Sequence, residues 1–327
     1  MRIGINGMGR IGRGLFKALA GLPGLEVAAV NDVARPATLA HLLAHDSYYG
    51  PWGTPVEAGP GRLRLGGLDL PCLAGERPDQ IPWGEHGVEW VVEATGRFKD
   101  RLSLSGHGRP VLLTASSREV DRQVVFGVNH GTIRPEDRLL SATSCTTHCV
   151  VPPLSVLHRA FGARAVLFNT VHCYNVGQTL VDAPRDDLRR ARAGALNMIP
   201  TTTSASLAVE SVLQELKGRV RGMAVRVPAP AVSLTELVVE AERPPAEPEA
   251  VNGALEAAAS GALSGVLGLS RQELVSQDFL GSPFSAVVDA PLTAVQGTMI
   301  RLIAWYDNER GYVMRLVDLL AWLRDRI

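Results

Sequence analysis

The residues best suited to chemistry form the stretch Ser144-Cys145-Thr146-Thr147-His148-Cys149. A mostly apolar run over residues 150–161 follows and predicts a helix, which puts Cys145 at a helix N-terminus. The positive end of a helix dipole lowers a thiol pKa and favours the nucleophilic thiolate. Ser144 suits an N-cap, and the nearby hydroxyl and N–H groups can bind an anion or an oxyanion. The alternative is that Cys145 is a small buried apolar residue at a helix start.

A nucleophilic thiol needs a base to take or hold its proton. His172 lies in Thr170-Val171-His172-Cys173-Tyr174, on a predicted strand over residues 165–174. A single strand histidine is more often an ordinary core or surface residue, so the residue type alone does not assign it a role.

The N-terminus carries a pattern typical of dinucleotide binding. A predicted strand over residues 2–6 runs into Gly7-Met8-Gly9-Arg10-Ile11-Gly12, and the next strand, residues 25–30, ends in Asn31-Asp32. The glycines let the backbone approach a pyrophosphate, and Asp32 can accept hydrogen bonds from a ribose 2′-hydroxyl while repelling a 2′-phosphate. The pattern favours NAD over NADP, and the alternative is a glycine-rich turn without a ligand.

Composition excludes several classes. The 327 residues are 46% hydrophobic and 20% charged with zero net charge, so we expect a globular protein without nucleic acid or membrane partners. Four cysteines are too few for a disulfide framework, and Cys145 and Cys149 lack a second pair, so no metal is expected. With no signal peptide and no apolar run of about 18 residues, we expect a cytoplasmic chain.

The candidate catalytic and dinucleotide-binding residues must be positioned by helices and strands. Alternating strands and helices in the first half predict an α/β fold with a doubly wound parallel sheet. The expected strands cover residues 2–6, 25–30, 90–94, 111–113, 124–128 and 139–142, with helices at 13–20 and 36–45 and small antiparallel strands within 51–74.

The second half of the chain has a different predicted pattern of secondary structure. Strands predicted at residues 165–174, 223–227, 234–242, 285–288 and 298–306 favour a mixed, mainly antiparallel sheet with helices on one face. Residues 184–200 form a long irregular segment with four arginines, which is typical of a functional loop or an interface. A closing amphipathic helix is expected over residues 312–327.

Several motifs together, in order along essentially the whole chain, resemble the phosphorylating glyceraldehyde-3-phosphate dehydrogenases. Beyond the glycine fingerprint and Ser144-Cys145-Thr146-Thr147, they are Glu93-Ala94-Thr95-Gly96, Gly127-Val128-Asn129-His130, Asp187-Leu188-Arg189-Arg190-Ala191-Arg192, Ile199-Pro200-Thr201-Thr202-Thr203, Arg226-Val227-Pro228, Val288-Asp289-Ala290 and Trp305-Tyr306-Asp307-Asn308-Glu309.

The resemblance implies a Rossmann NAD-binding domain over residues 1–144, completed by a C-terminal helix at 309–327, and a catalytic domain over 145–308. It implies that Cys145 attacks the aldehyde of glyceraldehyde 3-phosphate and that His172 acts as the base. The resulting thioester is opened by inorganic phosphate to 1,3-bisphosphoglycerate, a step of glycolysis. A homotetramer is also implied, with residues 175–200 near a subunit interface.

The remaining implied site residues fall into two groups. Those expected to bind NAD are Gly7, Gly9, Arg10, Ile11, Gly12, Asp32, Arg77, Thr95, Gly96, Thr114, Asn308 and Tyr312. Those expected to bind the substrate phosphate or inorganic phosphate are Ser144, Thr146, Asn175, Arg190, Thr203, Ser204 and Arg226.

The sequence departs from the family pattern around the anion sites. The family usually has Asn at His148, Thr at Asn175, Gly at Ser204, Trp at Arg310, and in many members Asp at Gly177. The departures keep open another phosphorylated aldehyde such as erythrose 4-phosphate, or arsenate as the acceptor. A third alternative is a non-catalytic NAD-binding regulator, against which the joint presence of Cys145, His172, Arg226 and Asn308 argues.

Overall fold

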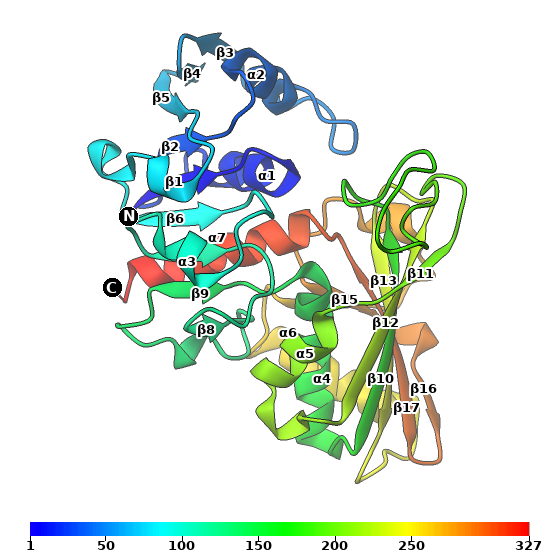
Figure 1. The fold of residues 1–327 in the computed structure, drawn as a ribbon. Helices are drawn as coiled ribbons and strands as arrows, with labels where there is room; N and C mark the ends of the chain where they lie inside the picture. Colours follow the sequence, from blue (N-terminus) through cyan, green and yellow to red (C-terminus); the bar gives the residue numbers. More distant parts are fainter. Residues whose placement is uncertain (327) are drawn as a thin grey trace. The chain divides into compact units, whose positions relative to one another are not determined.

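The first strand, β1 (Arg2–Asn6), is buried from Ile3 onward. In the computed structural model, which describes residues 1–326, β1 lies in the middle of a nine-stranded sheet (Figure 1). The strand order is β3-β4-β5-β2-β1-β6-β7-β9-β8, and every pair from β5 to β8 is parallel. The prediction of a doubly wound parallel sheet is therefore confirmed.

This sheet belongs to a first unit that contains residues 1–124, 130–144 and the chain from Val313 onward. Its further strands are β2 (Glu26–Asn31), β3 (Val56–Gly59), β4 (Arg62–Leu65), β5 (Leu68–Leu73), β6 (Trp90–Glu93), β7 (Val111–Leu113), β8 (Arg122–Gln123) and β9 (Leu139–Ser141). Its helices are α1 (Arg10–Leu19), α2 (Pro36–Ala44), α3 (Arg101–Ser105) and most of α7 (Arg310–Arg324). The β3–β4 and β4–β5 pairs are antiparallel, as predicted for residues 51–74.

Two sequence-based boundaries are corrected. Residues 124–128 are not a strand, because Gly127 has a positive φ of 88° and the N–H groups of Val128 and Asn129 turn back to the carbonyl of Val125. The last helix begins at Arg310 rather than residue 312, since Asp307 Oδ1 accepts the N–H groups at its start. Ile327, the predicted end of that helix, lies outside the described residues.

The second unit contains Val125–Asn129 and Cys145–Tyr312. Its strands are β10 (Ala165–Cys173), β11 (Ile199–Thr201), β12 (Val220–Val227), β13 (Ser233–Glu240), β14 (Leu267–Ser270), β15 (Ala286–Asp289), β16 (Ala294–Gln296) and β17 (Met299–Tyr306). The order is β11-β12-β10-β13-β17-β15-β14, with β16 paired to β17. Only β10–β12 and β14–β15 are parallel among the described pairs, which confirms the mixed, mainly antiparallel sheet.

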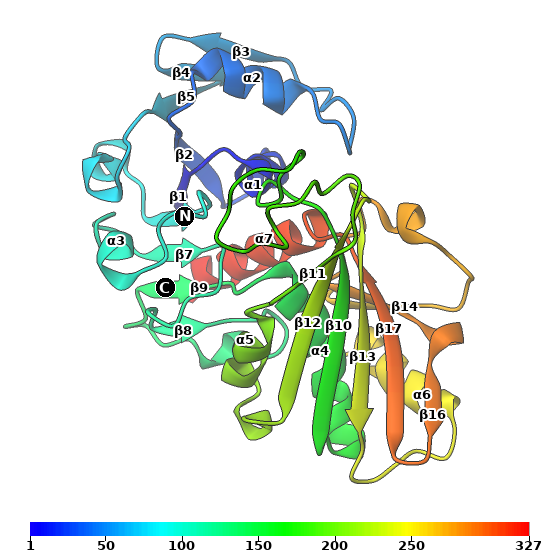
Figure 2. The same cartoon turned by 45° about the vertical axis from the view of Figure 1, so that its right-hand side comes forward.

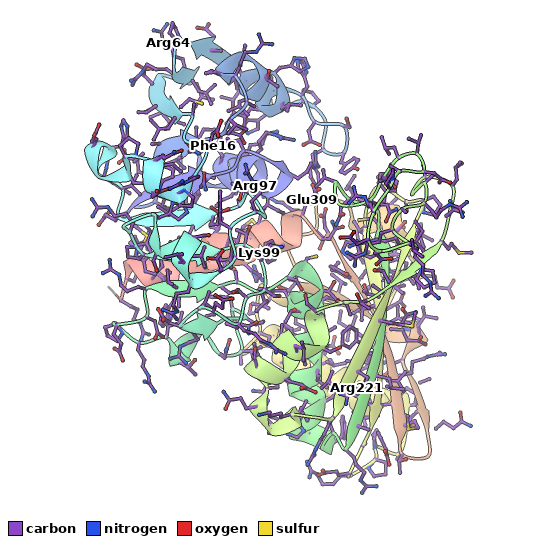
Figure 3. All side chains as sticks on the ribbon, in the orientation of Figure 1. Phe16, Arg64, Arg97, Lys99, Arg221 and Glu309 are labelled. Carbon is purple, nitrogen blue, oxygen red and sulfur yellow. The ribbon has the colours of Figure 1, made fainter. Side chains whose placement is uncertain are left out.

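One face of this sheet is covered by α4 (Cys145–Phe161), α5 (Ala205–Val212) and α6 (Pro248–Ser260), as both views show (Figures 1 and 2). Val166 and Phe168 of β10 point into the core with apolar residues of α4, while Leu167 between them is exposed. The same period of two places His172 on the helix-covered face. Charged side chains such as Arg221 extend from β12 (Figure 3).

No helix within residues 1–326 combines the length and the apolar character that crossing a bilayer requires.

Candidate active site

A strained turn precedes the candidate nucleophile. Thr143 has a positive φ of 53°, which is rare for a β-branched residue, and its N–H is held by the Ser141 hydroxyl at 3.1 Å. Such a backbone costs about 1–3 kcal/mol and is typical of functional sites. Helix α4 then begins at Cys145, which confirms the predicted place of this thiol at a helix start. Ser144 is the last residue of the 130–144 segment of the first unit.

Cys145 and His172 meet within the second unit. The Cys145 Sγ lies 3.6 Å from His172 Nε2, although the residues are 27 positions apart. Cys145 is half-buried and the imidazole is buried. The predicted thiol and base are therefore within reach of a proton transfer, as a base-activated nucleophile requires.

Arg226 completes this cluster because of strand register. In the parallel β10–β12 pair, His172 and Arg226 are direct partners, so their side chains project from the same face. Arg226 Nη1 lies 2.5 Å from His172 Nδ1 and donates to the carbonyl of Cys173 at 3.0 Å. The sequence-predicted phosphate anchor thus contacts the predicted base directly.

Burial governs the ionisation of this cluster. Burial raises the pKa of the Cys145 thiol, whereas the Arg226 guanidinium and hydrogen bonds from Thr146 act to lower it. Burial, followed by the charge of Arg226, lowers the pKa of His172 to about 3. The position at a helix start predicts a lowered pKa for the Cys145 thiol. That prediction is wrong for this site, because removal of the thiol from water raises its pKa.

Sequence reasoning gave no role to Tyr306, which lies in the same cluster. Its hydroxyl is 3.1 Å from the Thr146 Oγ1 and 2.8 Å from the Thr170 Oγ1, and its ring meets His172 edge-on at 6.0 Å between centroids. The side chain is 1% exposed. The sequence signal that could have pointed to Tyr306 is its place in the family motif at residues 305–309. The hydroxyl of Thr146, which is predicted to bind phosphate, is thus hydrogen-bonded to this buried tyrosine.

Cys173 was also missed. Its thiol donates to Asn308 Oδ1 at 3.0 Å, and Ser233 Oγ lies 3.5 Å from the same oxygen. The thiol is buried, which raises its pKa to about 11, so it acts as a neutral donor. Two donors on Oδ1 leave the amide nitrogen of Asn308, a predicted NAD ligand, to donate elsewhere.

The other predicted phosphate residues lie on the irregular segment after β10 and at the start of α5. Arg190 donates to the Thr201 hydroxyl at 2.7 Å and to the Thr202 carbonyl at 3.2 Å. Thr203 Oγ1 accepts the N–H of Ala205 at 3.1 Å. Asn175 is exposed, and its Oδ1 accepts the N–H of Gly177, so it is engaged in its own turn.

Three departures from the family pattern, at His148, Ser204 and Arg310, have defined surroundings. His148 is 2% exposed and packs edge-on against the ring of Tyr312, with centroids 5.4 Å apart. Ser204 is exposed and precedes α5 without a capping hydrogen bond from its side chain. Arg310, whose N–H bonds to Asp307, opens α7 beside Glu309, which Figure 3 labels.

The first unit contains the predicted dinucleotide site at the carboxyl ends of β1 and β2. Asp32 Oδ2 accepts the N–H of Met8 at 2.7 Å, and Oδ1 accepts the N–H of Ala34 at 2.9 Å. Gly9 is exposed, and a Cβ there would meet no atom within 4 Å, so its backbone can be approached closely. A Cβ at Gly12 would lie 1.9 Å from the carbonyl of Gly7, so the turn requires glycine. These features fit NAD.

A buried carboxylate holds the adjacent strand end. Glu93 accepts the N–H of Thr95 at 2.8 Å and its hydroxyl at 2.5 Å, and its backbone carbonyl accepts the Thr114 hydroxyl. Glu93 is fully buried, so this network is rigidly enclosed. Of the other predicted ligands, Arg10 is paired with Asp46, Arg77 is exposed and paired with Asp79, Ile11 is half-buried on α1, and Gly96 is exposed.

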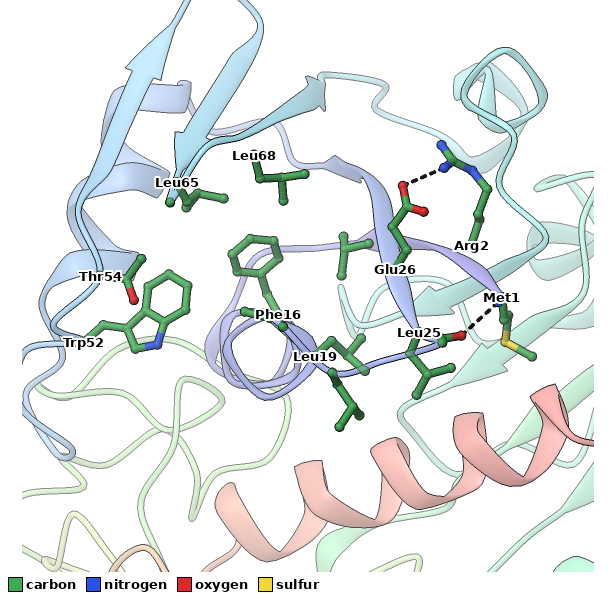
Figure 4. A pocket seen from close by; sticks show the side chains of 16 residues that line it. Met1, Arg2, Phe16, Leu19, Leu25, Glu26, Trp52, Thr54, Leu65 and Leu68 are labelled. Carbon is green, nitrogen blue, oxygen red and sulfur yellow. Dashed lines mark hydrogen bonds and ion pairs between the residues drawn. The ribbon is translucent and has the colours of Figure 1, made fainter.

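A cavity of about 630 Å³ in the first unit is separate from these residues (Figure 4). Phe16 and Leu19 of α1, together with Trp52 and Leu68, form its apolar wall, and the Arg2–Glu26 ion pair lies at its edge. None of the predicted site residues lines it. We therefore assign this cavity no part in the chemistry described above, although it is large.

Comparisons with known proteins agree with this geometry. Residues 1–101 match the family "Glyceraldehyde 3-phosphate dehydrogenase, NAD binding domain", and residues 144–308 match "Glyceraldehyde 3-phosphate dehydrogenase, C-terminal domain". The chain is 44% identical to the glyceraldehyde-3-phosphate dehydrogenase of Geobacillus stearothermophilus, covering 100% of this chain and 99% of the relative. It is 44% identical to glyceraldehyde-3-phosphate dehydrogenase 1 of Streptomyces avermitilis over 100% of this chain and 99% of that protein. Glyceraldehyde-3-phosphate dehydrogenase 2 of Streptomyces arenae is 45% identical over 98% of this chain and 97% of the relative. The chain belongs to the glyceraldehyde-3-phosphate dehydrogenase family.

Proposed function

We propose that this chain catalyses the NAD-dependent, phosphorylating oxidation of glyceraldehyde 3-phosphate to 1,3-bisphosphoglycerate. The observation that carries the proposal is the 3.6 Å approach of Cys145 Sγ to His172 Nε2 in a chain whose N-terminal unit holds the family's NAD binding domain. A thiol and an imidazole at this distance suit covalent catalysis at an aldehyde carbon.

Cys145 attacks the aldehyde carbon as its proton passes to His172. His172 gives this proton to the aldehyde oxygen, so that a thiohemiacetal with a hydroxyl group forms on the sulfur and the imidazole is again free to accept a proton. His172 then takes the proton of the thiohemiacetal hydroxyl as the carbon is oxidised to a thioester, and it returns a proton when the product leaves. NAD, when bound, supplies the hydride acceptor. Inorganic phosphate attacks the thioester carbonyl, the carbon–sulfur bond breaks, and the thiolate is restored.

Arg226 anchors the phosphate of the substrate, because a guanidinium binds phosphate through two parallel charge-assisted hydrogen bonds. Asn175 takes the place of a threonine hydroxyl at that anion. The attacking phosphate is assigned the remaining predicted anion ligands, which are Ser144, Thr146, Arg190, Thr203 and Ser204.

The domain assignment follows the same proposal. Residues 1–144 with the helix from 309 bind NAD, and residues 145–308 carry the catalysis. Within the first domain the pyrophosphate is assigned to the glycine turn and the ribose to Asp32, whose carboxylate is already fixed by two N–H groups. Arg77, Thr95, Gly96 and Thr114 are assigned to the rest of the cofactor, and Asn308 and Tyr312 to its nicotinamide.

We also propose a cytoplasmic homotetramer. The support is the segment after β10, where six large apolar side chains are 70–92% exposed. They are Val176, Leu180, Val181, Leu188, Leu196 and Met198. An exposed apolar cluster of this size is typical of a surface that another subunit covers. Sedimentation of the purified chain would measure the assembly.

Formation of NADH from a panel of aldehydes tests the function. The panel contains glyceraldehyde 3-phosphate, erythrose 4-phosphate and unphosphorylated glyceraldehyde, each with phosphate, with arsenate and with neither. We expect the highest kcat/KM with glyceraldehyde 3-phosphate, and steady turnover only when an acceptor anion is present. Cys145→Ser is the inactive control. A clear preference for erythrose 4-phosphate, or no NADH with any aldehyde, would contradict the proposal.

A further inference from the structure

Glu93 is a fully buried carboxylate at the end of β6 in the first unit. Its Oε1 lies 2.8 Å from the backbone nitrogen of Thr95 and 2.5 Å from the Thr95 hydroxyl. Its Oε2 lies 2.5 Å from Asn6 Nδ2 and 3.3 Å from His107 Nε2. A carboxylate offers about four lone-pair positions, so these contacts fill all of them. Glu93 therefore finds its complete set of hydrogen-bond partners inside the protein.

The backbone of Gly75 determines which atom of the Asn6 amide faces Glu93. The Gly75 N–H can only donate, and it lies 2.8 Å from Asn31 Oδ1. The Gly75 carbonyl can only accept, and it lies 2.9 Å from Asn31 Nδ2. Asn31 Nδ2 also donates to Asn6 Oδ1 at 2.8 Å. Because the Asn6 oxygen is engaged there, the Asn6 nitrogen is the atom that donates to Glu93.

Trp83 determines the position of the His107 proton in the same way. An indole N–H can only donate, and Trp83 Nε1 lies 3.0 Å from His107 Nδ1, so Nδ1 carries a lone pair. A doubly protonated imidazole would place two N–H donors against each other at this contact. The single ring proton is therefore on Nε2, where it donates to Glu93. Trp83 and His107 are 1% and 4% exposed, so they pair with each other rather than with water.

All the partners of Glu93 thus present a hydrogen to it. Asn6 and His107 donate to Oε2, and the N–H of Thr95 donates to Oε1. The Thr95 hydroxyl accepts the N–H of Arg97 at 3.1 Å, so its own hydrogen can point to Glu93. A protonated carboxyl would set its hydrogen against these donors, so the arrangement favours the ionised carboxylate. The charge is held by neutral donors.

These donors come from the strand ends that border the dinucleotide site. Asn6 ends β1, its partner Asn31 ends β2, and Thr95 follows β6. β1 lies between β2 and β6, where the strand order reverses, and open α/β sheets bind their ligands at such a point. A Cβ at Gly7 would lie 2.7 Å from the backbone nitrogen of Thr95, so the glycine turn packs directly on the segment that Glu93 holds.

We propose that Glu93 is a positioning residue for NAD: held by the Trp83–His107 pair, its buried charge joins the ends of β1, β2 and β6, so that the free protein already has the arrangement that binds the cofactor. The inference rests on the proposed function, which assigns the glycine turn and Thr95 to NAD. The apparent Kd of a ligand is its intrinsic Kd divided by the fraction of protein in the binding-competent arrangement. Loss of this charge, or of one of its donors, should therefore weaken NAD binding although none of these groups is assigned to touch NAD.

Glu93→Gln tests the charge with little change of shape. Glutamine keeps one oxygen, but its NH₂ group must face either the two donors of Thr95 or those of Asn6 and His107. We expect the Kd for NAD, measured by calorimetry, to rise at least about tenfold, which corresponds to the loss of one hydrogen bond to a charged group. Glu57→Gln, at an exposed position of β3, should bind NAD as the wild type does. Wild-type affinity in a folded Glu93→Gln variant would overturn the proposal, because the side chain would then only fill space.

Two substitutions of His107 test the supporting pair. His107→Phe removes the donor to Glu93 but keeps a ring, whereas the amide of His107→Gln can accept from Trp83 and donate to Glu93. We expect the Kd for NAD to rise about three- to tenfold in His107→Phe, since this contact is long at 3.3 Å, and to recover in His107→Gln. Urea unfolding of each variant shows whether folded protein is being titrated. An unchanged Kd in His107→Phe, or an equal rise in both variants, would overturn the proposal.

Nitrogen-15 NMR of histidine-labelled wild type tests the proton placement without any substitution. The ring signals of His107 are recognised by their proximity to the indole proton of Trp83, and we expect the Nε2–H form at neutral pH. A doubly protonated ring or an Nδ1–H form would overturn the proposal. NADH formation by the wild type, together with wild-type NAD affinity in folded Glu93→Gln, would overturn this inference and leave the proposed function intact. Absence of NAD binding by the wild type would overturn both.

Discussion

The buried neutral His172 has a measurable cost at low pH. Its pKa is lowered from 6.5 to about 3, first by burial and then by Arg226. Below the ordinary value the unfolded chain binds a proton that the folded imidazole excludes, so the free energy of unfolding falls as the pH falls. The loss grows by about 1.4 kcal/mol per pH unit, reaches about 2 kcal/mol near pH 5, and levels off near the folded pKa.

The substitution His172→Asn removes this titration while keeping a polar side chain of similar size. Urea unfolding of the ligand-free protein between about pH 7.5 and pH 5 should show the wild type losing about 2 kcal/mol more than the variant. His41→Asn, at an exposed position of α2, should keep the wild-type dependence. Parallel pH dependences for the wild type and His172→Asn would refute the argument, because they would mean that the folded imidazole takes up its proton as readily as the unfolded one.

Three further outcomes follow from the site. Asp32→Ala should narrow the preference for NAD over NADP in fluorescence titrations. The Asp32 carboxylate repels the 2′-phosphate of NADP, and two like charges about 4 Å apart cost about 1 kcal/mol in water and about 4 kcal/mol at an effective dielectric of 20. An unchanged ratio of the two dissociation constants would argue against this role of Asp32. Sub-stoichiometric iodoacetamide should label Cys145 before Cys72, Cys149 and Cys173, because burial raises the pKa of all four thiols but Cys145 is only half-buried and the other three are buried. Mass spectrometry showing another thiol labelled first would place the nucleophile elsewhere. Asn175→Thr combined with Ser204→Gly should improve the KM for glyceraldehyde 3-phosphate by about three- to tenfold, the value of one neutral hydrogen bond, and no change would mean that these departures are neutral.

The parts of the fold that depend on local patterns could be predicted from the sequence. The strand at residues 2–6, the glycine turn and Asp32 follow one another within a short segment, and each has a steric or electrostatic reason visible in the residue types. The α4 start at Cys145 is likewise local. The failed strand at residues 124–128 shows the limit, because a single glycine with positive φ turned an apolar run into a loop.

The contacts that define the cluster depend on register, which no local pattern specifies. Arg226 meets His172 because β12 pairs with β10 in parallel, 54 residues away in sequence. Tyr306 of β17 reaches Thr146 of α4 across 160 residues because the helix packs on the sheet, which is likewise not a local property. The pKa of Cys145 required the same information, since the helix start is a local property whereas burial depends on the strands packed around it. Resemblance to a family supplied the site residues, and the structure supplied their relations.

In the proposed mechanism Cys145 carries the oxidised substrate as a thioester. The protein is mixed with NAD and glyceraldehyde 3-phosphate in the absence of phosphate and arsenate, quenched in acid within one turnover, digested and analysed by mass spectrometry. We expect one acyl group per subunit on the peptide that contains Cys145, released on addition of phosphate and absent from Cys145→Ser. NADH formation without an acyl group on that peptide, or with the group on another cysteine, would contradict it.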